Sequence, residues 1–248
     1  MKIYKCSHKT IKNSQYWDPW LRNISDIILS LIDFESGKAL DVGCGTGRVS
    51  IFLAKRGFKV DAIDIEPKVI EIAKRLANEA KVEINFSVLD FTQKIDSFGE
   101  ELYDLIICSE VLEHVENYRN IIRNMYGRLK KNGTLIMTVP HDPNQYSILD
   151  SYAEHLQRFT ISQLKEDLRE FQITDCFTIG FPFMRMVVWL RAFVLDNILK
   201  KEPSPVKFWT GDLLGRICSF LVYELTKIDN FFIRLNKGTN IICKVRKK

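Results

Sequence analysis

The segment LDVGCGTGR, residues 40–48, places three glycines within five positions directly after a run of apolar residues. Gly43, Gly45 and Gly47 have no Cβ atom, so a turn built from them can be tight and a ligand can approach the bare backbone. The surrounding stretch KALDVGCGTGRVSIFLAKRG predicts a strand, a turn and a helix. This pattern favours the first unit of a doubly wound α/β sheet, in which a nucleotide-like ligand binds at the first strand-to-helix turn.

Strand-like and helix-like segments alternate along most of the chain. Helix-like segments such as residues 67–80 and 116–132 carry apolar residues at three- and four-residue spacing. This alternation predicts a parallel sheet with helices on both faces. The strand-like segments are, in order, KALDV, KVDAIDI, INFSVLD, YDLIICS, GTLIMTVP, ITDCFTIG and NIICKV.

Two segments lie outside this alternation and divide the chain into four parts. Residues 1–37 contain an aromatic stretch that leads into an amphipathic helix, which predicts an N-terminal helical cap. Residues 181–238 form a connection far longer than is usual in compact domains, so we expect a helical insertion there. The ligand-binding core then spans residues 38–180, and residues 239–248 supply the last core strand and a basic tail.

The composition limits the class of the protein and its partners. With 46% hydrophobic and 27% charged residues, the chain is typical of soluble globular proteins. The net charge of +5 is mild and the basic residues are scattered, which argues against nucleic acid and leaves an anionic membrane surface open. The six cysteines form no C-x-x-C pair, so we expect no zinc site. Without a signal-like start or a run of about 18 apolar residues, we expect a cytoplasmic protein, with peripheral membrane contact as the open alternative.

The residues around the glycine turn distinguish between two kinds of ligand. The dinucleotide fingerprint G-x-G-x-x-G requires a small residue where this chain has Arg48. Asp41 stands at the end of the preceding strand, and an acid there suits a cationic ligand better than a pyrophosphate. Asp64 ends the second strand-like segment 21 positions after Gly43, where a carboxylate can accept hydrogen bonds from both ribose hydroxyls. Asp61 is the competing acid, but it lies inside that segment.

A third acid closes the third strand-like segment. This acid is Asp90, and Phe91 follows it. Its carboxylate can accept a hydrogen bond from an adenine amino group, with an aromatic ring beside it. The alternative for Asp90 is a solvated acid in a turn. Together with the glycine turn and Asp64, these residues favour a site for a ligand with an adenosyl group.

Five motifs, in this order and spacing, resemble those of the class I S-adenosylmethionine-dependent methyltransferases: LDVGCGTG, AIDIEP, VLDF, YDLIICSEVLEHV and LKKNGTLIMTVP. The resemblance covers about residues 38–180 and is strongest to the branch that includes quinone-biosynthesis methyltransferases. It implies a Rossmann-like sheet of seven strands, with the last strand antiparallel and inserted between the fifth and sixth. It also implies that the glycine turn holds the methionine part of the cofactor, with the ribose, the adenine and the amino group bound farther along the strand ends. The cofactor-binding residues implied are Asp41, Gly43, Gly45, Gly47, Asp64, Ile65, Asp90, Phe91 and Ser109.

Residues after the fourth and fifth strands are candidates for handling the methyl acceptor. Glu110, Glu113 and His114 belong to SEVLEHV, and His155 and Arg158 belong to EHLQRFT. His155 and His114 are the candidate catalytic bases, and Arg158 is a candidate for binding an anionic acceptor. A packing or capping role is the alternative for either histidine. Because methyl transfer from a sulfonium requires mainly alignment, a base is optional.

The motifs that the chain lacks restrict its function further. After the fourth strand it has SEVL in place of the Asn/Asp-Pro-Pro-aromatic motif of methyltransferases that act on DNA bases. The sequence also shows no carboxylate cluster like the magnesium site of catechol-type enzymes, so we expect no metal. We predict a methyltransferase that uses S-adenosylmethionine on a small or lipid-like acceptor, at oxygen or carbon. The alternatives are a nucleotide-dependent oxidoreductase, which Arg48 disfavours, and a non-catalytic protein that binds S-adenosylmethionine.

A helical projection of residues 213–237, within the insertion, separates polar from apolar side chains. One interpretation is a helical cover that packs on the domain or on a second subunit, so both a monomer and a homodimer stay open. The other is an interfacial element over residues 183–237 that contacts a membrane and brings a lipid-like acceptor to the cofactor. The polar face comprises Arg216, Ser219, Tyr223, Lys227, Asn230, Arg234 and Lys237. The apolar face comprises Leu214, Ile217, Leu221, Leu225, Ile228, Phe232 and Leu235.

Overall fold

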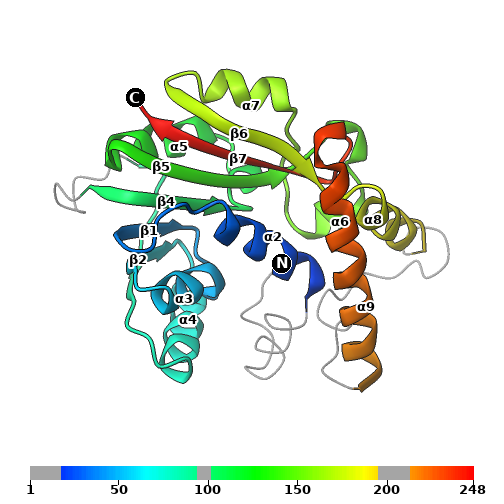
Figure 1. The fold of residues 1–248 in the computed structure, drawn as a ribbon, viewed down its shortest axis with the longest axis horizontal. Coiled ribbons are helices and arrows are strands. Elements are labelled where there is room, and N and C mark those ends of the chain that lie inside the picture. The colour runs from blue at the N-terminus through cyan, green and yellow to red at the C-terminus, as the bar shows by residue number, and fades with distance from the viewer. Residues whose placement is uncertain (1–17, 94–101, 195–212) are drawn as a thin grey trace.

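The computed structural model of the protein describes residues 18–93, 102–194 and 213–248. Within these residues, seven strands form one sheet in the order β3-β2-β1-β4-β5-β7-β6 (Figure 1). Strands β1 to β5 pair in parallel, whereas β7 pairs antiparallel with both β5 and β6. The predicted Rossmann-like sheet with an inserted antiparallel last strand is therefore confirmed. The strands are β1 (Lys38–Val42), β2 (Lys59–Asp64), β3 (Asn85–Val88), β4 (Tyr103–Ser109), β5 (Leu129–Pro140), β6 (Phe171–Ile179) and β7 (Asn240–Lys247).

Helices cover both faces of the sheet because its central strands are apolar on both sides. Ala39 and Leu40, which are neighbours in β1, belong to two different core clusters. The cluster around Ala39 contains side chains of α2 (Pro19–Ser30), α3 (Arg48–Lys55) and α4 (Pro67–Glu79). The cluster around Leu40 contains side chains of α5 (Tyr118–Arg128) and α7 (Ile161–Asp167). Short helical elements follow strand ends: η2 (Leu112–His114), η3 (Pro143–Gln145) and α6 (Ile148–Tyr152).

Local sequence signals explain where several helices begin. The Asp18 carboxylate accepts hydrogen bonds from the backbone N–H groups of Trp20 and Leu21, which caps α2. Pro67 occupies the first turn of α4, where a missing N–H leaves no bond unmade. Thr160 caps α7 through its side-chain oxygen. These caps hold the helices at the ends of the strands that they follow.

The boundary between α5 and β5 differs from the sequence prediction. The helix-like segment was expected to extend to residue 132, but α5 ends at Arg128 and β5 begins at Leu129. Leu129 pairs with Tyr103 of β4 and is fully buried, whereas the next three residues are exposed. The side chains of Lys130, Lys131 and Asn132 offer no apolar face to the core, so the strand pairing determines the conformation here.

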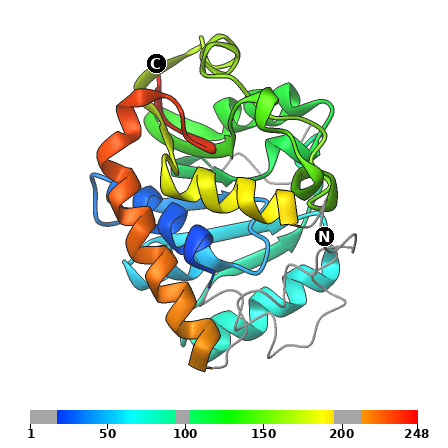
Figure 2. The same ribbon diagram turned by 90° about the vertical axis from the view of Figure 1, so that its right-hand side faces the viewer.

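The insertion forms helices that lie beside the cap helix. It contains α8 (Phe183–Val194), α9 (Leu213–Asp229) and η5 (Asn230–Leu235), and α9 packs along α2 (Figure 2). None of the helices in the described part of the chain has the length and apolarity needed to cross a membrane. The start of the predicted cap, residues 195–212 of the predicted insertion and the side chain of Leu214 lie outside the described residues.

The side of α9 that faces the domain carries buried polar residues, contrary to a cover that packs through apolar residues, whereas Arg216 and Lys227 of the predicted polar face are exposed. Ser219, Tyr223, Thr226 and Asp229 are buried, whereas apolar residues of the opposite face are exposed. The Tyr223 hydroxyl donates to the Asp26 carboxylate of α2 over 2.5 Å. Hydrogen bonds between polar side chains thus determine which face of α9 turns inward, and a helical projection alone does not carry this information.

Candidate active site

A cavity of about 600 Å³ opens at the edge of the sheet where the parallel strands β1 to β4 end. Its lining combines apolar side chains with a few acids, which is usual for a site that binds a small organic molecule. Six of the predicted cofactor residues line it: Gly43, Gly45, Asp64, Ile65, Asp90 and Phe91. Gly47, Asp41 and Ser109 are not among the described residues that line it. The wall also includes Glu110, Val111, His114, Val115 and Glu154.

The glycine turn after β1 has a backbone that side chains would disrupt. Gly43, Gly45 and Gly47 have φ angles of +67°, +54° and +78°, in the left-handed region that favours glycine. A Cβ atom on Gly43 would lie 2.4 Å from a methyl carbon of Val111, whereas one on Gly45 would meet nothing within 4 Å. Gly45 therefore presents bare backbone to open space beside the cavity. Gly47 serves as the N-cap of α3.

Asp64 connects the glycine turn to the end of β2. One carboxylate oxygen accepts from the backbone N–H of Gly45 over 2.9 Å, and the other accepts from the N–H of Glu66 over 3.0 Å. The N–H of Cys44 also donates to the carbonyl of Ile63. An ionised carboxylate has about four acceptor positions, so Asp64 retains capacity for the two hydroxyls of a ribose.

Asp41 is buried in β1 and contacts α3. Its carboxylate accepts a hydrogen bond of 2.5 Å from the Ser50 hydroxyl. Burial, which outweighs the hydrogen bonds from Ser50, raises the pKa of Asp41 to about 7. This hydrogen bond joins the first turn of α3 to β1, and the glycine turn lies between these two elements. The prediction that Asp41 binds the cofactor stays a prediction.

Asp90 and Phe91 follow β3 and have different environments. Asp90 accepts hydrogen bonds from the backbone N–H and the hydroxyl of Thr92 and from the side-chain amide of Gln93. The hydroxyl bond is the main reason why the pKa of Asp90 is lowered, so this carboxylate is ionised at neutral pH. Phe91 is buried in the core beside the cavity, and its carbonyl accepts a bond from Asn124. A charged acceptor and an apolar ring therefore stand together at the cavity.

The end of β4 holds two polar residues against β5 and β7. The Ser109 and Thr138 hydroxyls are 2.8 Å apart. Glu110 has a φ of +55°, and its carboxylate accepts bonds of 2.7 Å from both Thr138 and Asn240. Burial raises the pKa of Glu110. The positive φ of Glu110 lies where the chain leaves β4 and approaches η2, of which His114 lines the cavity.

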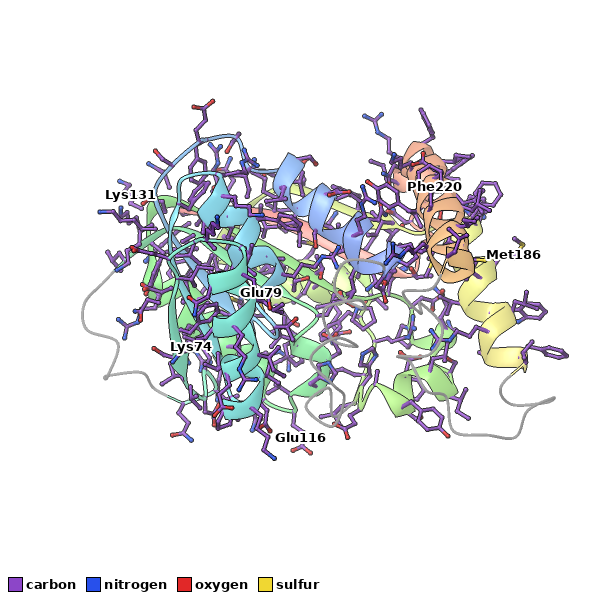
Figure 3. The ribbon with its side chains drawn as sticks, turned by 90° about the horizontal axis from the view of Figure 1, so that it is seen from below. Lys74, Glu79, Glu116, Lys131, Met186 and Phe220 are labelled. Carbon is purple, nitrogen blue, oxygen red and sulfur yellow. The ribbon has the colours of Figure 1, made fainter. Side chains whose placement is uncertain are left out.

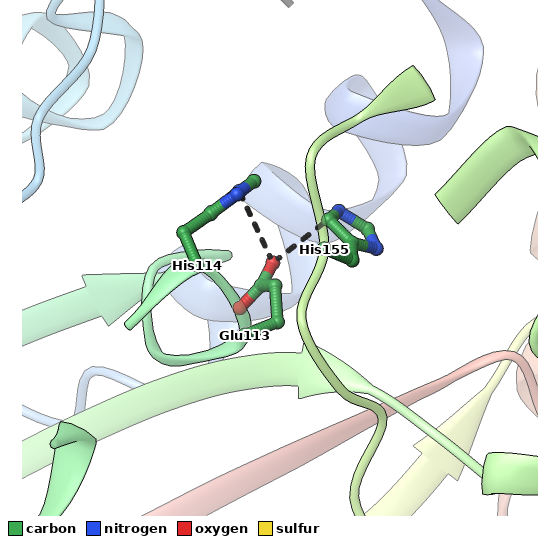
Figure 4. Close-up of side chains that lie close together, drawn as sticks. All are labelled: Glu113, His114 and His155. Atoms are coloured by element: carbon green, nitrogen blue, oxygen red, sulfur yellow. Dashed lines mark ion pairs between the residues drawn. The ribbon is translucent and has the colours of Figure 1, made fainter. Parts of the chain in front are cut away.

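Glu113, His114 and His155 form a cluster beside the cavity (Figure 4). The Glu113 Oε1 atom lies 3.8 Å from the Nε2 atom of each histidine. Glu113 is fully buried, and neither of its carboxylate oxygens has a hydrogen-bond partner. Burial, and then the nearby Glu110, raise the pKa of Glu113 well above its usual range. His114 lines the cavity, so one member of the cluster belongs to the cavity wall.

The neighbours of each histidine define which ring nitrogen carries the hydrogen. The Nδ1 atom of His114 is 3.2 Å from the carbonyl oxygen of Glu154, which can only accept, so Nδ1 carries the hydrogen. The Nδ1 atom of His155 is 2.9 Å from an oxygen of Asp150. Although burial opposes ionisation, hydrogen bonds from His155 and Arg158 keep the pKa of Asp150 at about 2, so it also accepts. The Nε2 atom of each ring, which carries no hydrogen in this tautomer, therefore lies near Glu113.

Three Lewis-basic atoms thus converge with no hydrogen between them unless one group is protonated. A proton, the hydroxyl of an acceptor or a metal ion would satisfy them, since the ligand atoms of Glu113, His114 and His155 lie within 4.8 Å of one another. Burial, and then the neighbouring His155, lower the pKa of His114, so this ring is neutral at neutral pH. The arrangement can accept a proton from a molecule in the cavity.

Arg158, predicted to bind an acceptor anion, lies within the protein. Its guanidinium donates to Asp150 over 2.8 Å and to the carbonyl of His141 over 2.9 Å, and its side chain is 7% exposed. His141 in turn contacts the carbonyl of Gly238. Sequence reasoning missed the roles of Asp150 and Asn240, because neither belongs to a motif. The one available signal was the acid at position 150, five residues before His155.

The residues of the cavity fit the cofactor that the sequence predicts. A turn with positive φ angles and bare backbone at Gly45, an acid with spare acceptor capacity at Asp64, and an acid beside an apolar ring at Asp90 suit an amino acid, a ribose and an adenine in that order. Arg48 occupies the position where a dinucleotide site requires a small residue. The arrangement therefore favours an adenosyl sulfonium over a dinucleotide.

Comparison with known proteins agrees with this interpretation. A family model described as a methyltransferase domain matches residues 14–175. The chain is 38% identical over 127 residues to a ubiquinone biosynthesis O-methyltransferase of Rickettsia felis, which covers 50% of each chain. It is 31% identical over 137 residues to the protein of that name from Xanthomonas campestris pv. campestris, covering 54% of this chain and 56% of the relative. The chain thus spans about half the length of the curated relatives that it matches.

Solved structures share the fold at low sequence identity. An N-methyltransferase, NodS from Bradyrhizobium japonicum in complex with S-adenosyl-L-homocysteine, superposes with a TM-score of 0.59 at 16% identity, covering 93% of this chain and 88% of that one. The [4+2]-cyclase SpnF superposes with a TM-score of 0.63 at 20% identity, covering 92% and 80%.

The chain belongs to the methyltransferase domain family, and its fold is that of the class I S-adenosylmethionine-dependent methyltransferases. The family, the fold and the class of cofactor predicted from the sequence are confirmed.

Proposed function

We propose that the protein transfers the methyl group of S-adenosylmethionine to a hydroxyl oxygen of a small or lipid-like acceptor. The observation that carries this proposal is the convergence of the Nε2 atoms of two histidines with the buried Glu113 carboxyl group beside the cavity, whose wall includes His114. A hydroxyl is the acceptor that profits most from such a base, because its oxygen becomes a stronger nucleophile as the proton leaves. The O-methyltransferase names of two relatives, each matched over about half its length, support oxygen over carbon.

In this proposal each part of the site has a defined task. The cofactor, when bound, supplies an electrophilic methyl group on a positively charged sulfur. The glycine turn and Asp64 hold its amino acid and ribose, and Asp90 with Phe91 holds the adenine. His114 accepts the proton of the acceptor hydroxyl at Nε2, while its Nδ1 hydrogen bond to Glu154 fixes the ring. The Glu113 carboxyl group lies between the two histidines and relays the proton to the Nε2 atom of His155, which Asp150 orients.

The substitution His114→Gln tests the role of the base. We expect the variant to bind S-adenosylhomocysteine like the wild type in calorimetry, and to lose about 10²- to 10⁴-fold in methyl transfer to a phenolic acceptor. His141→Gln is the matched control, because His141 contacts the Gly238 carbonyl and is not among the described residues that line the cavity. Unchanged turnover in His114→Gln, measured with radiolabelled methyl donor, contradicts the proposal.

Treatment with a chelator shows whether the cluster of Glu113, His114 and His155 acts as a base or binds a metal ion. With a base, turnover is unchanged after treatment with EDTA and dialysis. If EDTA abolishes turnover and Mg²⁺ or Zn²⁺ restores it, then Glu113, His114 and His155 bind a metal and the prediction of no metal is wrong.

The sequence leaves two other functions open. If the protein is a nucleotide-dependent oxidoreductase, calorimetry should show heat of binding with NAD and none with S-adenosylhomocysteine, whereas our proposal predicts the reverse. If the protein binds S-adenosylmethionine without catalysis, it should bind the cofactor and show no methyl transfer to any of a panel of phenols, quinols and amines. The [4+2]-cyclase neighbour illustrates that the fold alone does not specify methyl transfer.

A further inference from the structure

Helices α8 and α9 and the following η5 carry large apolar side chains that face solvent. Trp189 of α8, Phe220 of α9 and Phe231 of η5 are 63%, 56% and 85% exposed. Figure 3 shows Met186 of α8 and Phe220 of α9 on the same side of the molecule. Single exposed apolar residues are common on soluble proteins, but a group of aromatic residues on consecutive helices marks an interaction surface. We call this surface, on residues 183–194 and 213–235, the α8–α9 face.

The fold itself fixes the outward direction of the α8–α9 face. The buried side of α9 is held to α2 by the hydrogen bond from Tyr223 to Asp26. The buried Asp229 carboxylate accepts bonds of 2.8 and 2.9 Å from the backbone N–H groups of Phe183 and Met184, which caps the start of α8. Rotating α9 to bury its apolar residues would break all of these bonds. The apolar residues are therefore left for a partner outside the described fold.

The charges around the α8–α9 face are mostly positive. Over residues 183–194 and 213–237 the acids are Glu224 and Asp229, against six arginines and lysines. Glu224 is paired with Lys227 over 2.8 Å, and Asp229 is buried. Exposed cations include Arg234 and Lys237 at the end of the face. An apolar surface with a basic border is complementary to the headgroups and acyl chains of an anionic bilayer.

We propose that the α8–α9 face docks the protein on an anionic membrane surface, with Trp189, Phe220 and Phe231 entering the interface. A second copy of the chain is a poorer occupant, because a two-fold interface would bring like-charged borders together. The helices lie on the membrane in this proposal, because none of the described helices can cross it. Aromatic side chains are favoured at the interface between headgroups and acyl chains.

The α8–α9 face begins at the edge of the sheet that carries the cavity. Strand β6 runs in the direction of β1, and α8 follows its end at Ile179. Arg185 of α8 approaches the Asp142 carboxylate, which follows β5, to 4.0 Å. A lipid-like acceptor would thus reach the cavity edge from the membrane to which the protein docks. This last step rests on the proposed function, whereas docking itself does not.

Co-sedimentation with vesicles tests the proposal without cofactor or acceptor. We expect the full chain to bind vesicles of phosphatidylcholine with phosphatidylglycerol, and to bind pure phosphatidylcholine weakly. The double substitution Phe220→Glu and Phe231→Glu should lower the partition coefficient at least about tenfold. Leu102→Glu is the matched control, because Leu102 is 43% exposed and precedes β4, at the opposite edge of the sheet. The pair Arg234→Gln and Lys237→Gln should lower binding to the anionic vesicles by about 30-fold at low salt.

The outcomes separate this proposal from its rivals and from the proposed function. Binding that the Phe220→Glu and Phe231→Glu pair leaves unchanged, or no binding to anionic vesicles at all, overturns the docking proposal. A dimer in light scattering that becomes a monomer in the same variant assigns the α8–α9 face to a second copy instead. Affinity for S-adenosylhomocysteine should be equal in all these variants, so a failure of vesicle binding leaves the methyltransferase proposal standing.

Discussion

The substitution Asp64→Asn tests the placement of the cofactor in the cavity. The carboxylate holds the glycine turn through Gly45 and has acceptor positions left for a ribose. Asparagine keeps the size of the side chain but loses the charge and one acceptor oxygen. Hydrogen bonds to a charged group contribute about 1.5–3 kcal/mol, so we expect the affinity for S-adenosylhomocysteine to fall roughly 10- to 150-fold.

Calorimetry with two ligands separates the ribose contact from the shape of the turn. Adenosine contains the ribose but lacks the amino acid part that the glycine turn holds. If Asp64 binds the ribose, Asp64→Asn weakens adenosine and S-adenosylhomocysteine by the same factor. If the residue acts only by shaping the turn, the loss falls on S-adenosylhomocysteine alone.

Asp61→Asn provides the matched control in the same strand. The Asp61 carboxylate accepts bonds from the Tyr103 hydroxyl over 2.8 Å and from Asn85 over 3.0 Å, and it is buried. This variant should lose thermal stability and keep its affinity for both ligands. A folded Asp64→Asn protein with wild-type affinity, or an Asp61→Asn protein with the larger loss of affinity, refutes the assignment of the ribose to Asp64.

Three further predictions address the glycine turn and the supports of the site. Gly43→Ala places a Cβ atom 2.4 Å from Val111, so calorimetry should show at least about a tenfold loss of S-adenosylhomocysteine affinity, since 1.4 kcal/mol of distortion equals that factor. The pKa of Asp41 is about 7 in the fold and 3.8 without it, so its protonated form stabilises the protein fully below pH 3.8 and this contribution is lost as the pH rises to about 7. Asp41→Asn should therefore gain stability relative to the wild type over that range, by at most about 4 kcal/mol in denaturant titrations, and a constant difference speaks against the raised pKa. Tyr223→Phe removes one hydrogen bond between α9 and α2 and should lower the free energy of unfolding by about 0.5–1.5 kcal/mol, with unchanged stability as the contrary result.

The sequence allows the sheet and the glycine turn to be predicted because their signals are local. A strand, a turn with three glycines and a helix occur within one short segment, and the acids at strand ends follow from the parallel arrangement. The boundary at Leu129 was missed because a strand pairing with Tyr103 competes there with helical spacing. Pairing with a distant strand leaves no mark in the local pattern.

The burial and hydrogen-bond partners of the acids and the orientation of α9 depend on contacts with residues far away in the sequence. The motif SEVLEHV identifies Glu113 as a candidate, but its burial, its lack of hydrogen-bond partners and its approach to the distant His155 are visible only in the fold. A helical projection separates the two faces of α9, yet the choice of the inward face depends on Asp26, which lies far away in the sequence. Sequence patterns therefore predict the elements and the candidate residues, and only the fold defines their partners.

A crystal structure of the full chain with S-adenosylhomocysteine tests the central claim most directly. The account predicts density along the turn from Gly43 to Gly47, with the ribose hydroxyls on Asp64 and the adenine between Asp90 and Phe91. Its sulfur should face the side of the cavity that His114 lines. Density for the ligand outside this cavity, or a ribose turned away from Asp64, would contradict the account.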